Sequence, residues 1–381
     1  MKLLFVHDHK FRKINNSFYS TGGLNDEVLS RYTNIFDEVI VFSRVIEEQN
    51  ESNKYSKITN SKVTIINSLT ATKDLIKELV KKTDKVIVRM PCFNGIKFLP
   101  LCRKLNRNYL IELVACPWDS FWNYDWRGKV IAPFIYLFNK IEVSKAPNVL
   151  YVTEKFLQRR YPNKNNTLAC SDVVLKKNSE EVLINRKEII EKSKPIINLG
   201  TLAAIDVKYK GQDRVIKAMG VLAKKGIYNY KYYLAGNGDK TYLLKLARKL
   251  HIDNNIIFDG GIPHEQIDDW FKKIDIYIQP SLQEGLPRSL VEAMSNALPC
   301  IGSTTGGIPE LLDNQFIFSN RNSVKQIKKL LLKMTKGQML SQAELNFQNS
   351  KKYQIDILEQ KRNNFYNDFK NQSKELRSHK K

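Results

Sequence analysis

Short apolar runs rich in Val, Ile and Tyr alternate with amphipathic stretches along the chain, a pattern typical of a parallel sheet wrapped by helices. The alternation occurs twice. In the first half the expected strands are 2–8, 38–44, 62–67, 85–90, 109–114 and 148–153. In the second half they are 195–202, 231–235, 255–259, 274–279, 299–303 and 316–319. The sequence therefore predicts an α/β protein with two doubly wound, Rossmann-like domains that face each other across a cleft.

A polar and weakly patterned segment separates the two sets of expected strands. We interpret it as a linker, with a helix over 182–190 as an alternative. The last stretch with helical apolar spacing, 353–369, predicts a closing helix. A length of 381 residues exceeds what one core usually holds, which agrees with two domains. The expected parts are 1–175 as the first domain, 176–194 as the linker, 195–350 as the second domain, and 351–381 as the closing helix with a basic tail.

The charge of the chain indicates an anionic partner. With 62 Lys and Arg against 39 Asp and Glu, the net charge is +23, which favours nucleic acid, an acidic membrane leaflet or a phosphorylated substrate. Lysine-rich helix faces that are simply solvated are an equal alternative for most of this excess. Five cysteines lack the paired spacing of a metal site, the first apolar run is too short for a signal peptide, and no run reaches transmembrane length. We therefore expect a cytoplasmic protein with reduced thiols.

Two carboxylates flank the turn between the expected strand 274–279 and a helix that begins near Pro287. Glu284 lies in the turn, and Glu292 lies about a turn and a half into the helix. This turn is at the carboxyl edge of a sheet, where α/β enzymes do their chemistry. Free amides and the helix dipole favour a phosphate there, whereas carboxylates accept hydrogen bonds from sugar hydroxyls. A nucleotide diphosphate sugar carries both groups and would satisfy the whole arrangement.

The sequence motifs around these two acids resemble those of the retaining glycosyltransferases of family four, which have the GT-B fold. Glu-Gly-Leu-Pro at 284–287 is similar to one variant of the family's Glu-x7-Glu signature. Further similar motifs follow in the family's order between about 195 and 312, which is far more specific than one pattern. They are Asn-Leu-Gly-Thr-Leu at 198–202, Tyr-Lys-Gly-Gln-Asp at 209–213, Leu-Ala-Gly-Asn-Gly-Asp at 234–239, Phe-Asp-Gly-Gly at 258–261, Asp-Ile-Tyr-Ile-Gln-Pro-Ser at 275–281 and Gly-Gly-Ile-Pro-Glu at 306–310.

The resemblance implies roles for residues of the second domain, which would bind the donor. Glu292 would bind the ribose, although an exposed helix carboxylate is the alternative. Glu284 would contact hydroxyls of the donor sugar and stabilise positive character at the reacting carbon, or else cap the helix. Lys210 would compensate the departing diphosphate, help that is often worth several kcal/mol. The donor-binding set also includes Leu286, Pro287, Arg288 and Ser289 around the diphosphate, together with Gly236 and Ile262.

The first domain would bind the acceptor and contribute a second glycine loop. Gly22 and Gly23 open an expected helix after Thr21, and they resemble the family's double-glycine loop, whose backbone approaches the donor phosphates and the acceptor. An ordinary turn before a helix is the alternative. The segment is not a P-loop, because no Lys-Ser or Lys-Thr pair follows the glycines. The resemblance also implies that the closing helix returns to pack on the first domain.

The chain departs from the family's pattern at two places. Thr201 stands where many relatives have an Arg, and Lys208 is either its substitute or a solvated lysine. Many relatives also have a His after the strand that corresponds to 109–114, whereas this chain has Trp118 and Asp119 nearby. We expect His9, Trp118 and Asp119 on the acceptor side, with a structural role as the alternative. A donor phosphate oxygen can itself take the acceptor proton, and the lack of a metal-ligand cluster fits a metal-independent enzyme.

Aromatic and basic residues of the first domain suggest contact with a sugar or a membrane. Trp118, Trp122 and Trp126, together with Phe121 and Tyr124, could stack on sugar faces, sit at a membrane interface or belong to the core. The stretch 129–145 has an apolar face with flanking lysines. Such a basic amphipathic element would suit a lipid-linked acceptor at the inner leaflet.

We therefore predict a retaining hexosyltransferase that moves a sugar from a nucleotide diphosphate sugar to a saccharide or lipid-linked acceptor, as in capsule or O-antigen synthesis. A UDP-sugar is the expected donor by family frequency, with no further cofactor and no nucleic acid partner. The first alternative is a GT-B sugar-nucleotide epimerase or a phosphorylase. No motif indicates the acid and base groups that an epimerase needs or the lysine-bound pyridoxal cofactor that a phosphorylase needs. The second is a basic nucleic-acid-binding protein, for which no recognisable binding motif is present.

Overall fold

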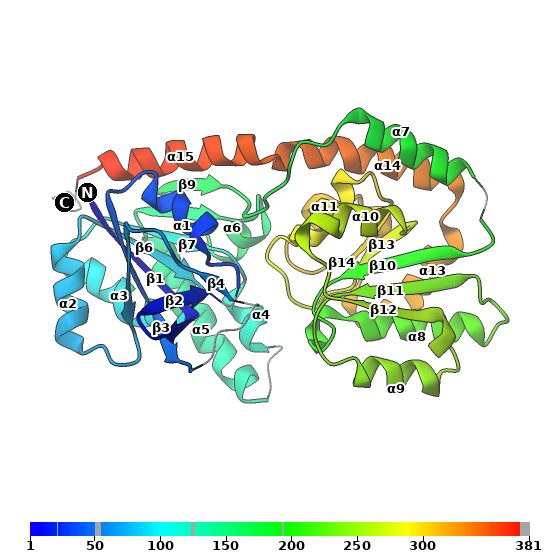
Figure 1. Cartoon of the computed structure of the whole chain (residues 1–381), viewed down its shortest axis with the longest axis horizontal. Helices are drawn as coiled ribbons and strands as arrows, with labels where there is room; N and C mark the ends of the chain where they lie inside the picture. The colour runs from blue at the N-terminus through cyan, green and yellow to red at the C-terminus, as the bar shows by residue number, and fades with distance from the viewer. Residues whose placement is uncertain (21, 50–54, 123–125, 193, 374–381) are drawn as a thin grey trace. The chain divides into compact units, whose positions relative to one another are not determined.

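The computed structural model describes residues 1–20, 22–49, 55–122, 126–192 and 194–373. Thr21, Tyr124 and the tail from 374 onward lie outside these ranges. The chain forms two compact units (Figure 1). The first unit comprises Met1–Trp118, Ala132–Cys170 and Glu359–Lys381, and the second comprises Asp119–Ile131 and Ser171–Leu358. None of the described helices is long and apolar enough to span a membrane.

The first unit is built on a parallel sheet in the order β5-β3-β1-β6-β7-β8-β9, so the first strand of the chain lies inside the sheet. All six expected strands of this half are confirmed. The central strands are almost wholly buried because helices cover both faces, as for Leu3, Phe5 and Val6 of β1, whereas β5 at the sheet edge is only partly buried. The strands are β1 (Lys2–Ile14), β3 (Glu38–Glu47), β5 (Val63–Asn67), β6 (Lys85–Met90), β7 (Tyr109–Leu113), β8 (Asn148–Tyr151) and β9 (Asn166–Ala169).

Strand β1 is longer than the pattern predicts. Its register to β3 shifts between Val6 and Lys10, and the strand then continues to Ile14. Beyond this bulge it turns back through Asn15, whose positive φ of 55° is tolerated by asparagine, into the antiparallel strand β2 (Ser17–Ser20). The antiparallel β4 (Ser56–Lys57) pairs with β2. The sequence did not predict β2, β4 or β9, because each is only two to four residues long and has no continuous apolar run.

Helices flank this sheet, and side-chain caps fix the first turns of α1 (Asp26–Thr33) and α2 (Lys73–Lys82). Asn25 Oδ1 accepts from the amide of Val28 at 3.1 Å, and Thr72 Oγ1 accepts from the amide of Leu75 at 3.2 Å. One contiguous core packs the sheet against the helices. The helices are α1 (Asp26–Thr33), α2 (Lys73–Lys82), α3 (Phe93–Lys104), α4 (Pro117–Trp122), α5 (Trp126–Lys145), α6 (Phe156–Arg160) and α15 (Ile355–Asn371). The part of α4 from Asp119 and the part of α5 up to Ile131 group with the second unit.

The last helix, α15, confirms the helix expected near 353–369, and its residues from Glu359 onward belong to the first unit. A buried carboxylate holds it there. Glu112 of β7 accepts from Tyr366 Oη at 2.5 Å, from Tyr32 Oη at 2.9 Å and from Arg89 Nη1 at 2.8 Å. The ammonium of Lys85 donates to the carbonyl of Gln372 at 2.6 Å. The C-terminal helix is therefore anchored to the first sheet by charged hydrogen bonds as well as by packing.

The second unit has a wholly parallel six-stranded sheet in the order β12-β11-β10-β13-β14-β15. Successive strands are added on one side of β10 up to β12 and on the other side from β13 on, so the strand order reverses between β10 and β13. All six expected strands are confirmed. They are β10 (Ile197–Leu202), β11 (Tyr230–Ala235), β12 (Ile256–Gly260), β13 (Ile276–Gln279), β14 (Cys300–Ser303) and β15 (Ile317–Phe318). The helices around them are α7 (Glu180–Glu191), α8 (Gln212–Ala223), α9 (Thr241–Lys249), α10 (Ile267–Lys272), α11 (Arg288–Ser295), α12 (Ile308–Leu311), α13 (Ser323–Lys333) and α14 (Lys336–Ser350).

The stretch that we expected to link the domains, 176–194, contains helix α7 and forms part of the second unit. Leu183 and Ile190 of this helix are buried against Ala343 and Phe347 of α14. Arg186 is also buried, and its guanidinium donates to the carbonyls of Ile274 at 2.7 Å and Phe271 at 2.9 Å. The segment is polar in composition, yet its few apolar side chains and one arginine bind it to the second core.

We predict that Glu112→Ala lowers the free energy of unfolding by roughly 3–5 kcal/mol, because it leaves the Arg89 guanidinium without its buried carboxylate partner. Urea denaturation followed by circular dichroism measures this. Glu38→Ala is the matched control, since Glu38 pairs with Lys2 at 2.9 Å on the surface and should cost less than about 1 kcal/mol. Equal losses in the two variants would contradict a structural role for the buried cluster.

Candidate active site

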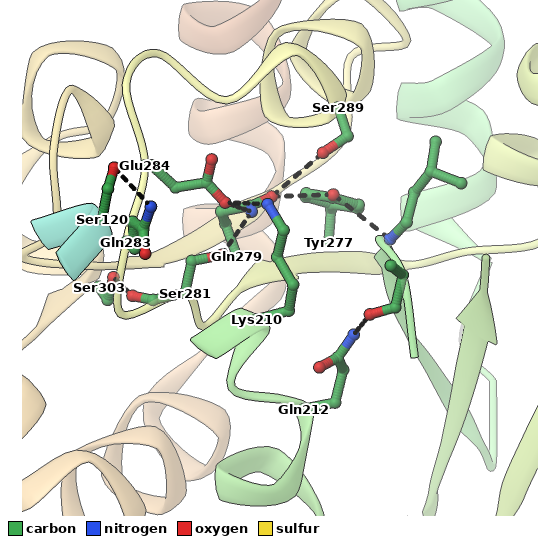
Figure 2. Close-up of polar contacts among 12 residues, drawn as sticks. Ser120, Lys210, Gln212, Tyr277, Gln279, Ser281, Gln283, Glu284, Ser289 and Ser303 are labelled. Carbon is green, nitrogen blue, oxygen red and sulfur yellow. Dashed lines mark hydrogen bonds and ion pairs between the residues drawn. The ribbon is translucent and has the colours of Figure 1, made fainter. Parts of the chain in front are cut away.

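Loops that follow the strands of the second sheet meet at its carboxyl edge, next to the point where the strand order reverses (Figure 2). One loop follows β10 and contains the short 3-10 turn Lys208–Lys210. Another connects β13 to α11 through residues 280–287, and a third follows β14 through residues 304–307. In doubly wound sheets this edge is where ligands bind.

Gly211 fixes the first loop against the second. Its φ is 76°, and a Cβ placed on it would lie 2.1 Å from the carbonyl oxygen of Pro280. Only glycine permits this approach of one backbone to another. The amide of Leu282 donates to the carbonyl of Tyr209 at 2.7 Å and completes the contact. The side chain of Lys210 is thereby held over the loop that carries Glu284.

Gly306 fixes the third loop against the loop that carries Glu284. Its φ is 58°, and a Cβ there would lie 2.3 Å from the carbonyl oxygen of Glu284. The amide of Gly307 donates to the carbonyl of Gly285 at 2.7 Å. The hydroxyl of Ser303 donates to the carbonyl of Ser281 at 2.6 Å. The loop bearing Glu284 is therefore clamped on both sides by backbone contacts.

Lys210 and Glu284 form an ion pair at the centre of this arrangement. The Nζ–Oε1 distance is 2.7 Å, and both side chains are largely buried (Figure 2). The structure thus brings together the two residues that we expected to be catalytic. A positive and a negative group held side by side can receive a ligand that itself combines an anionic part with hydroxyl groups.

Gln279, the last residue of β13, links Glu284 to its surroundings. Its Nε2 donates to Glu284 Oε1 at 3.2 Å and to Ser281 Oγ at 2.9 Å. Its Oε1 accepts from the hydroxyls of Tyr277 at 3.0 Å and Ser289 at 3.3 Å. The side chain is fully buried, and all four contacts involve side chains of β13, the loop or α11 (Figure 2). Gln279 therefore orients Glu284 and ties it to the start of α11.

The N-terminus of α11 is open toward this loop. Its N-cap is Pro287, whose side chain caps none of the first-turn amides. Proline has no N–H, so among the four residues expected to surround the diphosphate only Leu286, Arg288 and Ser289 supply amide donors. Pro287 is buried, whereas Arg288 is exposed. Uncapped amides at a helix N-terminus form a site for an anion.

Glu292 lies one turn further along α11, where burial raises the pKa of its carboxyl group. The charges of Arg288 and His264 act in the opposite direction, and Asp268 adds to the increase. Among the described residues, no donor forms a hydrogen bond with this carboxylate. The position leaves Glu292 able to accept hydrogen bonds from a ligand in the same loop region.

Thr201 stands at the position where relatives have an Arg, and Lys208 was the possible substitute for that Arg. Thr201 is buried, with its hydroxyl 2.7 Å from Tyr232 Oη and 2.6 Å from the carbonyl of Ile278. Lys208 Nζ lies 5.5 Å from the centre of the Tyr242 ring. Lys208 also lines a cavity of about 110 Å³ with Asp213 and other residues. The cation that pairs with Glu284 is thus Lys210, while Lys208 lies against Tyr242.

Two further expected donor residues follow neighbouring strands. Gly236, after β11, has a φ of 148°, and a Cβ there would lie 2.0 Å from the carbonyl of Ala203. Its amide donates to the carbonyl of Gly260 at 2.7 Å. Ile262, after β12, is half-buried. Gly236 therefore has a structural reason to be glycine, independent of any ligand.

The first unit holds its own expected residues close together. His9 Nε2 is 2.9 Å from Ser20 Oγ, which also receives the amide of Gly22 at 3.3 Å. A Cβ on Gly22 would lie 3.8 Å from the His9 ring, and one on Gly23 would meet open space. The double-glycine loop and His9 therefore form one local cluster in the first unit.

Trp118 and Asp119 fall on opposite sides of the boundary between the units. Trp118 packs edge-on to the Tyr136 ring at a centroid distance of 5.9 Å, and the Arg160 guanidinium lies 5.9 Å above its ring. It is half-buried at the margin of the first core. Asp119 belongs to the segment that groups with the second unit. Contact of either residue with an acceptor stays a prediction.

Comparison with known proteins agrees with this geometry. Residues 179–352 match the family described as glycosyl transferases group 1. The chain is 33% identical over 344 residues to the protein CapJ of Staphylococcus aureus, covering 86% of this chain and 85% of CapJ. The chain belongs to the group 1 glycosyltransferase family. This glycosyltransferase is also 29% identical over 138 residues, 34% of each chain, to the amylovoran biosynthesis glycosyltransferase AmsK of Erwinia amylovora.

Solved structures place the glycosyltransferase in the GT-B fold. HepE of Anabaena, solved in complex with UDP, superposes with a TM-score of 0.63 over 94% of this chain and 98% of its own, at 15% identity. At that identity the likeness shows the fold. The two Rossmann-like domains expected from the sequence are thus confirmed as those of a group 1 glycosyltransferase.

Sequence reasoning missed Gln279, Tyr277 and Ser281 of this glycosyltransferase. The signal was present, because Gln279 is a polar residue that ends a run of buried apolar positions, Ile-Tyr-Ile. A buried amide requires partners on both its oxygen and its nitrogen. The predicted site took residues from the loop and from α11 but none from the strand β13 that precedes them.

We predict that Gln279→Leu lowers kcat by roughly ten- to a hundredfold, because Glu284 loses a donor that orients it. Steady-state kinetics with varied donor measures this, and the KM for the donor should change less than kcat. Ser289→Ala removes one 3.3 Å hydrogen bond and serves as the control, with a change of a few-fold at most. A loss of kcat that merely follows a lower melting temperature would contradict a positioning role.

A second prediction concerns the histidines of the first unit. Burial lowers the pKa of His7 to about 3, with the charges of Arg89 and Arg44 adding to the effect. Burial also lowers the pKa of His9 to about 4, with the charge of Arg44 adding to the effect. An ordinary His titrates near about 6.5, so the unfolded chain binds protons below that pH that these two do not. The two neutral histidines therefore contribute to the free energy of unfolding above about pH 6.5, and this contribution falls as the pH drops toward 4.

Nitrogen-15 NMR of labelled histidines should therefore show both rings neutral from pH 8 down to about 5. His7→Gln and His9→Gln assign these two rings among the signals of the five histidines. Titration of either ring near its ordinary value would show that the buried arrangement around Ser20 and Arg89 does not form.

Proposed function

We propose that this protein is a retaining glycosyltransferase that moves a hexose from a nucleotide diphosphate sugar to a saccharide or lipid-linked acceptor. The observation that carries the proposal is the Lys210–Glu284 pair, at 2.7 Å, beside the uncapped N-terminus of α11. Group 1 membership supports transfer chemistry. UDP is the proposed nucleotide, and the structure of HepE with UDP supports it by shared fold.

The ligand would divide between the two kinds of group in this site. The diphosphate would lie against the first-turn amides of α11 and draw Lys210 toward itself, because both offer positive charge. Glu284, freed from Lys210, would accept from hydroxyls of the sugar and oppose the positive character of its anomeric carbon. Glu292 would accept from the ribose.

The reaction would exchange one bond on one face of the sugar. The bond from the anomeric carbon to the diphosphate oxygen breaks, and its electron pair leaves with the diphosphate. The acceptor hydroxyl oxygen bonds to the same face, and its proton passes to the departing phosphate oxygen. Lys210 would stabilise the charge on that oxygen, so we propose that the reaction proceeds without a metal. In the part of the chain that the structure describes, no three His, Cys, Asp or Glu side chains gather as a metal site.

We further propose that the product belongs to a surface polysaccharide assembled on the cytoplasmic side of the membrane. AmsK, a partial relative, is named for amylovoran biosynthesis, and CapJ is similar over most of its length. The strongly basic surface, with a net charge of +23, suits an acceptor carried by an anionic lipid phosphate.

We predict that Lys210→Ala and Glu284→Gln each lower kcat by roughly a hundred- to a thousandfold, because each removes a charge that acts on the transition state. Lys208→Ala is the matched control and should retain activity, since Lys208 lies over Tyr242. Release of nucleoside diphosphate in the presence of acceptor is the assay. Full activity in either site variant would contradict the proposed roles.

The anomeric configuration of the product distinguishes the alternatives. Proton NMR of the glycoside should show the configuration of the donor. An inverted product would exclude retention, and a modified nucleotide sugar formed without acceptor would indicate an epimerase. Salt-sensitive binding to duplex DNA without donor turnover would instead support the nucleic-acid-binding reading.

A further inference from the structure

Helix α13 (Ser323–Lys333), in the second unit (Figure 1), carries a row of three lysines. Lys325, Lys329 and Lys333 are four positions apart, so they lie on one side of the helix, roughly 6 Å from one to the next along its axis. All three are exposed, and the sequence of the helix contains no Asp or Glu. Within the described part of the chain, none of the three forms an ion pair. Like charges at this spacing repel each other, so an anion bound beside them would stabilise the row.

The three lysines line a cavity of about 570 Å³. Residues 315–317 and Gln338 of α14 also line it. Cavities that bind organic ligands usually have volumes of roughly 300–1,000 Å³. The lysines therefore border a recess that can hold several chemical groups at once, and not only a single inorganic anion.

The neutral residues that line this cavity suit a sugar. Gln315, Gln326 and Gln338 carry amides, which can both donate to and accept from hydroxyl groups. Gln326 Oε1 and Gln338 Oε1 each accept from a backbone amide, at 2.8 and 3.0 Å, and among the described residues their Nε2 groups have no hydrogen-bond partner. Leu330 and Met334, both half-buried, add apolar surface to the lining. Sites for organic ligands combine such apolar surface with a few polar groups that fix the orientation of the ligand.

A second cavity, of about 340 Å³, continues the row of cations and shares Lys325 with the first. Arg321 lines it and is exposed. The preceding residue, Asn320, donates from Nδ2 to Thr305 Oγ1 at 2.8 Å. Thr305 lies in the loop after β14, next to Gly306. The two cavities together, here called the α13 groove, therefore reach to the side of the candidate active site.

We propose that the α13 groove binds an acidic oligosaccharide, a chain of sugars that carries carboxylate or phosphate groups. The lysines would pair with the anionic groups, and the glutamine amides would bind hydroxyls of the same chain. A free phosphate ion would use the lysines alone. Duplex DNA would also pair with the lysines, but its backbone offers no hydroxyl to the amides. An acidic oligosaccharide uses both sets of groups and has the length to follow the row.

This inference deepens the proposed function by assigning a chemical class to the glycan that the enzyme would extend, and only that consequence rests on the proposed function. A glycan in the α13 groove would have one end beside the loop that contains Thr305 and Gly306. Binding can be measured without donor, acceptor transfer or turnover. Failure of this binding and failure of transfer are therefore separate results.

Fluorescence anisotropy with a labelled hexamer of galacturonic acid tests the proposal on the full-length protein. The wild type should bind the hexamer at least roughly tenfold more tightly than labelled maltohexaose, which has hydroxyls but no carboxylates. Lys329→Gln combined with Lys333→Gln should weaken binding of the acidic hexamer by roughly tenfold or more, because two carboxylates lose charged hydrogen bonds. High salt should weaken binding by the wild type.

A matched control keeps the number of substitutions, their spacing and the charge change constant. Lys245→Gln combined with Lys249→Gln removes two exposed lysines that are four positions apart on α9, outside the α13 groove. This variant should bind the acidic hexamer like the wild type. The melting temperatures of both double variants should stay close to that of the wild type, since all four lysines are exposed.

Four results would overturn the proposal. The first is no binding of the acidic hexamer by the wild type, and the second is equally tight binding of maltohexaose. The third is an equal loss of binding in the two double variants, which would reduce the effect to the overall charge of the protein. The fourth is tighter binding of a short DNA duplex that depends on Lys329 and Lys333, which would assign the groove to nucleic acid.

Discussion

Close contact between backbones at the carboxyl edge of the second sheet is the constraint on which the site depends. Gly211 and Gly306 each place a loop so near the β13–α11 loop that a Cβ would lie about 2 Å from a carbonyl oxygen of Pro280 or Glu284. The positions of neighbouring side chains are fixed as well, because these side chains are attached to loops that cannot move apart without losing hydrogen bonds. Lys210 and Glu284 are therefore brought together by glycines that carry no chemistry of their own.

At the centre of the resulting site, one positive and one negative side chain lie side by side. Lys210 and Glu284 offset each other, so the site is stable without a ligand, yet each partner can be drawn away by a group of opposite sign. Gln279 holds Glu284 through uncharged hydrogen bonds, which persist whichever partner Lys210 takes. The open N-terminus of α11 adds positive potential without a further side-chain charge. A ligand with a diphosphate at one end and hydroxyls at the other uses every one of these groups.

The sequence predicts the fold well because buried parallel strands are nearly continuous apolar runs between helical stretches, and all twelve expected strands are present. It predicts β2 and β4 poorly because short polar strands at a sheet margin have no such run. Helix α7 was ambiguous because Arg186 is buried while its charge reads as exposed. At the site, motif order locates Lys210 and Glu284, but the network of Gln279 depends on side-chain directions that spacing along the chain does not contain.

The most direct test of the proposed donor site is a crystal structure of the protein with a bound nucleoside diphosphate, UDP first. The diphosphate should lie against the amides of Arg288 and Ser289, with Lys210 turned from Glu284 toward a phosphate oxygen and Glu292 bonded to the ribose. A nucleotide bound away from α11, with the Lys210–Glu284 pair intact beside it, would contradict the assignment of these residues to the donor.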